Sequence, residues 1–211
     1  MKALIIKDFL NLRSSFKQIF SSALVFIGLG LFLKKPFYIY SLVSVMSLSY
    51  PLSFFSYDEK ADFYSYGLGL PLSRKQLVGA RYISSFAILA LSMCLIFLAN
   101  IGLIVPRMGL SLLESIASLL AISLSAALIL SILLPLAFRF GAEASRRMLS
   151  LVVLAIFGLM ALLATRLLGF FEVQELEVLI PRLLIILPFL VAGLIFISLR
   201  VSLRLVEKMD F

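Results

Sequence analysis

The sequence lacks histidine and tryptophan and has a single cysteine, Cys94. A zinc site built from histidine and cysteine ligands is therefore excluded, and so is a disulfide within the chain. Charged residues are also scarce, at 14%, against about a quarter in a soluble domain. Hydrophobic residues make up 63% of the 211 positions, which predicts an integral membrane protein with one compact bundle and no separate soluble catalytic domain.

Nucleotide-binding motifs are missing as well. A P-loop needs a Gly-Lys pair so that backbone N–H groups can surround phosphates, and no such pair occurs in the chain. The Gly67-Leu68-Gly69 stretch lacks the third glycine of a dinucleotide fingerprint. We therefore expect no enzyme activity and no cofactor bound by this chain. Transport would need either a partner ATPase or an ion gradient.

Long apolar runs are abundant, and a helix that crosses a bilayer needs roughly 20 such residues. Six runs approach or reach that length: Ile19–Leu33, Phe37–Phe55, Ile83–Val105, Ser115–Phe138, Leu149–Leu168 and Leu183–Leu199. The predicted fold class is an all-α integral membrane protein with six transmembrane helices. An even number of spans places both termini on the same side.

The distribution of Lys and Arg predicts which side that is. The N-terminal segment, the second and fourth connections and the C-terminal tail together hold 14 of the 19 basic residues. Basic residues concentrate in cytoplasmic loops, so both termini are expected to be cytoplasmic in a multi-pass protein of the plasma membrane. This bias also accounts for the net charge of +8, so we expect no nucleic-acid partner.

Residues 1–18 carry a helical pattern. Apolar side chains recur along one predicted stripe, at Ile5, Phe9, Leu12, Phe16 and Phe20. Polar residues, among them Lys7, take the other side, and Arg13 adds a further positive charge. Such a helix can lie in the membrane interface and contact lipid. The alternative is that it is only the cytoplasmic start of the first span.

The connection between the second and third runs, residues 57–82, is polar and much longer than a plain connection needs. Its acidic start, at Asp58, Glu59 and Asp62, suits a helix N-terminus. Ser73, followed by Gln76, has the spacing of a capping box that opens a second helix. Two short helices would make a compact docking surface; a solvated connection is the alternative.

Several short motifs in this part of the chain resemble those of ABC-2 type permeases. They are Met1–Leu4, Lys7–Phe9, Tyr57–Lys60, Leu70–Val78 and Arg81–Tyr82. The resemblance covers roughly residues 1–82 and is nearest to small six-span permeases of peptide and antibiotic-peptide exporters, including phenol-soluble modulin exporters. It implies a single ABC-2 type transmembrane domain over residues 1–211.

Members of that family are the transmembrane halves of ATP-driven exporters. The resemblance implies a dimer with a second permease copy or paralogue, a separate ABC ATPase that carries ATP and magnesium, and an amphipathic peptide or hydrophobic toxin as cargo. It also implies that the 57–82 region couples to the ATPase. The candidate coupling residues are Asp58, Glu59, Asp62, Leu70, Pro71, Ser73, Arg74 and Lys75.

Two other functions remain open at this point. A proton- or sodium-coupled secondary transporter normally has titratable or oxygen-rich groups at the bilayer midplane, and the predicted spans carry no carboxylate there. Asn100 is the one strongly polar side chain near the interior of a span, and it is a candidate for the substrate path. The other alternative is a membrane scaffold or immunity protein that transports nothing.

Overall fold

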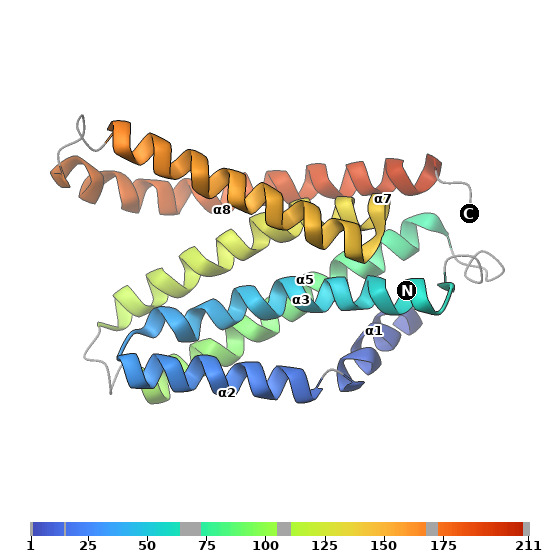
Figure 1. Cartoon of the computed structure of the whole chain (residues 1–211), viewed down its shortest axis with the longest axis horizontal. Coiled ribbons are helices and arrows are strands. Elements are labelled where there is room, and N and C mark those ends of the chain that lie inside the picture. The colour runs from blue at the N-terminus through green and yellow to red at the C-terminus, as the bar shows by residue number, and fades with distance from the viewer. Residues whose placement is uncertain (1, 15, 64–72, 105–110, 168–172, 209–211) are drawn as a thin grey trace.

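The computed structural model describes residues 2–14, 16–63, 73–104, 111–167 and 173–208. In chain order these residues form α1 (Lys2–Ser14), α2 (Phe16–Leu33), α3 (Pro36–Lys60), α5 (Arg74–Ala99), a short π-helical segment η1 (Asn100–Ile104), α7 (Leu112–Leu167) and α8 (Val173–Lys208). No strand occurs within the described ranges, so the predicted all-α class is confirmed. Figure 1 shows the long helices packed side by side, with α1 set at an angle to α2.

Four helices in the described part of the chain are long and apolar enough to cross a membrane: Pro36–Lys60, Arg74–Gly102, Leu112–Val152 and Ile186–Lys208. A shorter apolar helix, Phe20–Leu33, precedes them. The multi-span prediction is therefore confirmed in its coarser form. The count of six spans stays a prediction, because it needs Phe20–Leu33 and the later part of α7 each to cross the bilayer as well.

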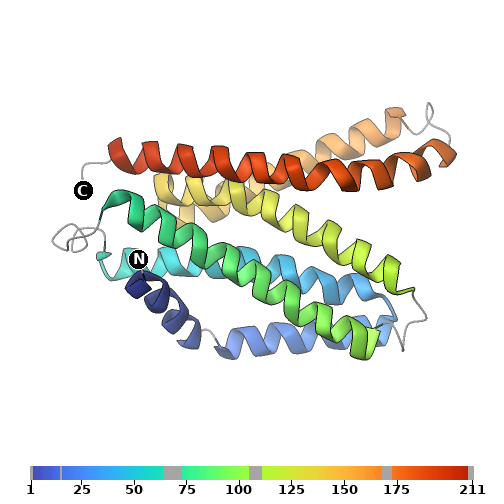
Figure 2. The same ribbon diagram turned by 180° about the vertical axis from the view of Figure 1, so that it is seen from behind.

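A backbone break divides α7. Gly141 has φ 79° and ψ 178°, outside the helical region, and this conformation favours glycine. Figures 1 and 2 show that the chain reverses direction within α7, so that both parts of the helix extend from the break toward the same end of the bundle. The fourth and fifth predicted spans are thus joined with almost no loop between them.

The acidic start of the 57–82 region does not open a new helix. α3 continues from Pro36 to Lys60 without interruption, so Asp58 and Glu59 lie in its last turn. The predicted helix N-terminus at these residues is wrong. Negative charge is unfavourable at a helix C-terminus, and both carboxylates are instead stabilised by contacts with other helices.

α2 and α3 form a tight hairpin. Lys34 has φ 51° after the last turn of α2, and the N–H of Lys35 donates to the carbonyl of Gly30 at 3.1 Å. That bond is the long one of a Schellman motif, and Pro36 then begins α3 with its fixed φ. Gly30 also lets the two helices approach, because a Cβ there would collide with Cγ1 of Ile39 and lie 2.9 Å from its Cδ1.

Three buried clusters lie along the described helices, and the smallest consists of Tyr50, Phe54 and Ile88. Phe55 and Phe138 meet edge to face, with ring centroids 4.9 Å apart, in the cluster that joins α3, α5, α7 and α8. Its other fully buried members include Leu52, Val78, Tyr82, Leu130, Leu133, Leu134 and Val206. A second cluster joins α3 to α5 and α7 through Ile39, Tyr40, Leu42, Val43, Ile96 and Leu119. α3 contributes to all three clusters and also packs against α1 and α2, so it is the central helix of the described fold.

The close approach of α2 and α3 can be tested by two substitutions in α2, one of which is a matched control. Gly30→Ala should destabilise the protein by roughly 1–3 kcal/mol, because the added methyl group overpacks against Ile39. Gly28→Ala meets no atom within 4 Å and should be neutral or stabilising by up to about 1 kcal/mol, as alanine is the better helix former. Unfolding in mixed detergent micelles measures both, and equal effects would contradict the close approach.

Candidate functional site

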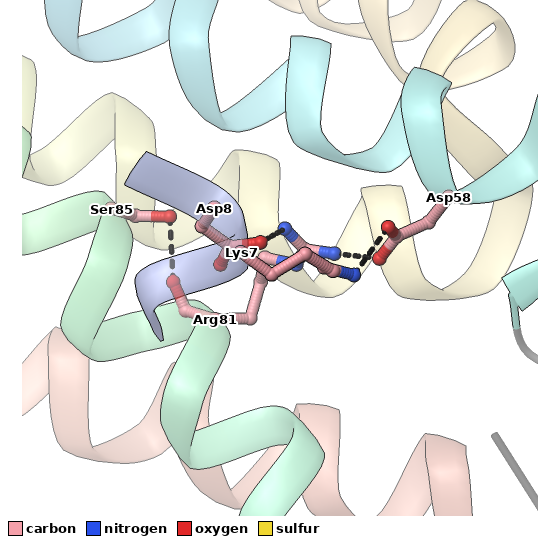
Figure 3. Close-up of polar contacts among 5 residues, drawn as sticks. All are labelled: Lys7, Asp8, Asp58, Arg81 and Ser85. Carbon is pink, nitrogen blue, oxygen red and sulfur yellow. Dashed lines mark hydrogen bonds and ion pairs between the residues drawn. The ribbon is translucent and has the colours of Figure 1, made fainter. Parts of the chain in front are cut away.

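Four charged side chains meet where α1, α3 and α5 converge. Arg81 of α5 donates from Nη1 to Oδ1 of Asp8 at 2.8 Å, and from Nη2 to Oδ2 of Asp58. Lys7 donates from Nζ to the other Asp58 oxygen at 2.6 Å. Figure 3 shows Arg81 between the two carboxylates, with Lys7 beside it. We call these four residues the charge cluster.

The ion pairs of Arg81 are buried, unlike an ordinary ion pair at a protein surface. The side chains of Arg81, Asp8 and Asp58 are 5% or less exposed, whereas that of Lys7 is 30% exposed. Two cations and two anions leave the charge cluster with no net charge. Taking charges out of water is costly unless each is paired and hydrogen-bonded, so removing one buried member strands its partners.

Aromatic rings cover the cations. The Arg81 guanidinium lies 4.9 Å from the ring centroid of Phe55 and 5.6 Å from that of Phe54. The ammonium of Lys7 lies 3.5 Å from the ring centroid of Phe63. Such cation–π contacts gain strength where water is excluded. The charge cluster is therefore covered by aromatic side chains, and its cations are not freely exposed at the surface.

The buried face of α1 differs from the predicted stripe. Leu4 and Asp8 are buried, while Ile6, Phe9 and Leu10 are exposed. The pairing of Asp8 with Arg81 explains this, because it turns the acidic side of α1 toward the bundle. Arg13 is exposed as well. The contact of α1 with the membrane interface stays a prediction.

Burial raises the pKa of the Asp8 carboxyl above its ordinary value of 3.8, and the neighbouring Arg81 opposes that shift. A small cavity of about 10 Å³ adjoins the charge cluster and has room for roughly one water molecule. Its lining residues are Leu4, Lys7, Asp8, Asp58, Phe63, Leu77, Ala80 and Arg81. No group of His, Cys, Asp or Glu that could hold a metal ion occurs among the described residues.

The start of α5 matches its prediction. The N–H of Gln76 donates to Oγ of Ser73 at 3.2 Å, and the N–H of Ser73 donates to Oε1 of Gln76 at 3.3 Å. The predicted capping box is thus confirmed. Ser85, one turn into the same helix beyond Arg81, donates from Oγ to the Arg81 carbonyl at 2.8 Å (Figure 3).

Other candidate coupling residues make contacts within the chain. Arg74 donates from Nη1 to the carbonyls of Val206 (3.2 Å) and Glu207 (2.6 Å). A cation there neutralises the free carbonyls at the C-terminus of α8. Glu59 accepts a hydrogen bond from the N–H of Ala142, the residue after the break in α7. These contacts were not predicted from the sequence.

The remaining candidates are spread out. Lys75 and Asp62 are exposed, and Asp62 has a left-handed φ of 49°. Leu70 and Pro71 lie outside the described residues. Asn100 is buried, and its Oδ1 accepts a hydrogen bond from Oη of Tyr40 at 2.9 Å. That bond links α3 to the π-helical segment, and a role for Asn100 in a substrate path stays a prediction.

Sequence reasoning did not place Asp8 and Arg81 in one site. A signal was present, because Asp8 is the single acidic residue among the first 57 positions. It also stands four residues after Leu4, which is one helical turn. An isolated acid in an otherwise basic and apolar segment indicates a buried cationic partner, but the sequence alone does not identify which cation.

A charge-balance test probes the site. Arg81→Met leaves two buried carboxylates with only Lys7 between them and should cost about 3–5 kcal/mol of unfolding free energy. Lys7→Met should cost less, because Asp58 keeps Arg81. Adding Asp8→Asn to Arg81→Met should recover part of the loss, since Lys7 and Asp58 then form a balanced pair. Unfolding in micelles measures the cycle, and strictly additive losses would contradict the charge cluster.

The raised pKa of Asp8 has a consequence for pH. The folded protein binds this proton more tightly than the unfolded chain, so Asp8 lowers stability as the pH rises through the range above 3.8. Asp8→Asn removes that titration. We expect the difference in unfolding midpoint between wild type and Asp8→Asn to shift in favour of the variant as the pH rises from below 3.8 to above it. A pH-independent difference would count against the raised pKa.

Comparison with known proteins adds one match. A family model described as ABC-2 family transporter protein matches residues 3–207. The matched range includes α1, the charge cluster, the break in α7 and nearly all of α8. Curated proteins and solved structures give no match.

Proposed function

This chain belongs to the ABC-2 family of transporter proteins, and from that premise we propose that it is the permease subunit of an ATP-driven exporter. The family match confirms the resemblance noted in residues 1–82 and extends it over the chain. The protein is thus a multi-pass membrane component of a transporter. The separate ABC ATPase, the dimer, the direction of transport and the cargo belong to the proposal.

The observation that carries the proposal is the charge cluster. Arg81 joins α1, α3 and α5 in one contact. The 57–82 region begins in the last turn of α3 and ends in the first part of α5. A motor that pushes on this region would therefore displace three helices together. Figures 1 and 2 show that α1, the end of α3, the start of α5 and the end of α8 lie at the same end of the bundle. We assign this end to the cytoplasm.

The proposed cargo and the proposed second permease copy are supported by the apolar surface of the described helices. Exposed apolar side chains run along α2, α5 and α8, among them Phe32, Leu98 and Phe189. Such faces suit lipid, a second copy or paralogue, and a cargo that is itself amphipathic or hydrophobic. Peptides or hydrophobic toxins fit that description better than ions, because the described spans offer little charge to compensate an ion.

Purification in mild detergent from native membranes, followed by mass spectrometry, tests the proposal. A soluble ATPase that co-purifies in stoichiometric amount, and whose hydrolysis responds to the permease, is the expected result. A preparation free of ATPase even after crosslinking would contradict the proposal. A secondary transporter would then be recognised by gradient-driven flux without ATP, and a scaffold or immunity protein by the absence of flux.

Single charge reversals separate docking from folding. Lys75→Glu alters an exposed side chain and should weaken ATPase association roughly fivefold while leaving the unfolding temperature unchanged. Arg74→Glu should lower both association and stability, because it replaces the cation that binds the α8 carbonyls, at a cost of roughly 1–3 kcal/mol. Co-purified ATPase per permease and thermal unfolding are the two readouts. Unchanged association of Lys75→Glu would remove Lys75 from the docking surface.

A further inference from the structure

The break in α7 lies directly against the last turn of α3. Oε1 of Glu59 accepts a hydrogen bond from the N–H of Ala142 at 2.6 Å. A Cβ at Gly141 would lie 2.5 Å from that same oxygen and 3.2 Å from the carboxyl carbon. The contact therefore requires both a glycine at the break and an acceptor on α3.

The position of Glu59 is unfavourable for its own helix and favourable for its neighbour. A helix begins with unpaired N–H groups and partial positive charge, and ends with partial negative charge. Glu59 stands at the negative end of α3 but accepts from the first residue after the break, where the second part of α7 begins. The carboxylate thus acts as an N-terminal cap supplied by another helix.

Glu59 is also next to the charge cluster. Asp58 is bound by Lys7 of α1 and Arg81 of α5, while Glu59 binds α7. Two successive residues of α3 therefore connect the N-terminal helix, the start of α5 and the hairpin of α7. Since the two parts of α7 meet at Gly141 with almost no loop, any force applied there acts on both parts.

We propose that Glu59 is a positioning residue that transmits displacement of the 57–82 region to α7, so that the α7 hairpin moves together with α1 and α5. The source of the displacement rests on the proposed function, because it is the partner ATPase. The link from α3 to α7 is a property of this chain alone. The two can therefore be tested separately.

Four variants isolate the contact. Glu59→Ala removes the acceptor, whereas Glu59→Gln keeps a carbonyl oxygen that can accept from Ala142. Gly141→Ala disturbs the same contact from the other side. Lys60→Ala is the matched control, because Lys60 is the next residue of the same helical turn and is exposed.

Hydrogen exchange tests the link without any ATPase. In Glu59→Ala, the amide of Ala142 should exchange roughly tenfold faster than in the wild type, because it has lost its cap. Glu59→Gln and Lys60→Ala should stay near the wild-type rate. Gly141→Ala should resemble Glu59→Ala, and it keeps the test valid if Glu59→Ala fails to fold. Unchanged exchange in both disruptive variants would overturn the proposal.

Spin labels test transmission in the complex with the co-purified ATPase, in lipid nanodiscs. Labels at Phe32→Cys and Leu113→Cys, both exposed positions, report the movement of α7 relative to α2, which holds no member of the charge cluster, in a Cys94→Ser background. Adding ATP with vanadate should change that distance in the wild type, in Glu59→Gln and in Lys60→Ala. The change should be lost in Glu59→Ala.

The two possible failures look different. A wild-type complex without an ATPase, or without any nucleotide-driven change, contradicts the proposed function while the exchange result still decides the link. A wild-type change that persists undiminished in Glu59→Ala contradicts transmission through Glu59 while the exporter assignment stands.

Discussion

A buried guanidinium sets the arrangement at the polar end of this bundle. Arg81 is nearly inaccessible to water, so its charge has to be balanced by carboxylates brought from elsewhere in the chain. Asp8 and Asp58 provide that balance from two different helices. The orientation of α1 follows, because Asp8 reaches Arg81 only if the acidic side of α1 faces inward. With Asp8 facing inward, Ile6 and Leu10 lie on the exposed side of α1.

This explains which features could be predicted. The long apolar helices and the capping box at Ser73 depend on local composition and spacing, so the sequence was sufficient for them. The face of α1 and the end of α3 depend on partners more than 20 residues away. The apolar periodicity of α1 identifies a stripe that includes Ile5 and Phe9, but it has no term for a buried ion pair and so does not show that Asp8 faces the bundle. An end-charge argument likewise misplaces a helix start at Asp58.

The two acidic residues at the end of α3 bind different helices of the bundle. Asp58 faces α1 and α5, and Glu59 faces the break in α7. Arg74 adds a third connection by binding the carbonyls at the end of α8. Each contact satisfies charges or backbone groups that a helix end would otherwise leave unpaired. At the polar end, these interhelical bonds connect all of the helices named above. The 57–82 region begins and ends among the residues that make them.

The order of these residues along the chain bears on biogenesis. Asp8 and Asp58 both precede Arg81, so a nascent chain presents both carboxylates before the guanidinium leaves the ribosome. The cation thus enters the bundle with its counter-ions already in place. The reverse holds for Glu59, whose partner Ala142 is made much later, and its carboxylate can stay hydrated until the α7 hairpin arrives. The early helices are thereby able to associate as a unit, and the later hairpin closes onto a carboxylate that is already present at the end of α3.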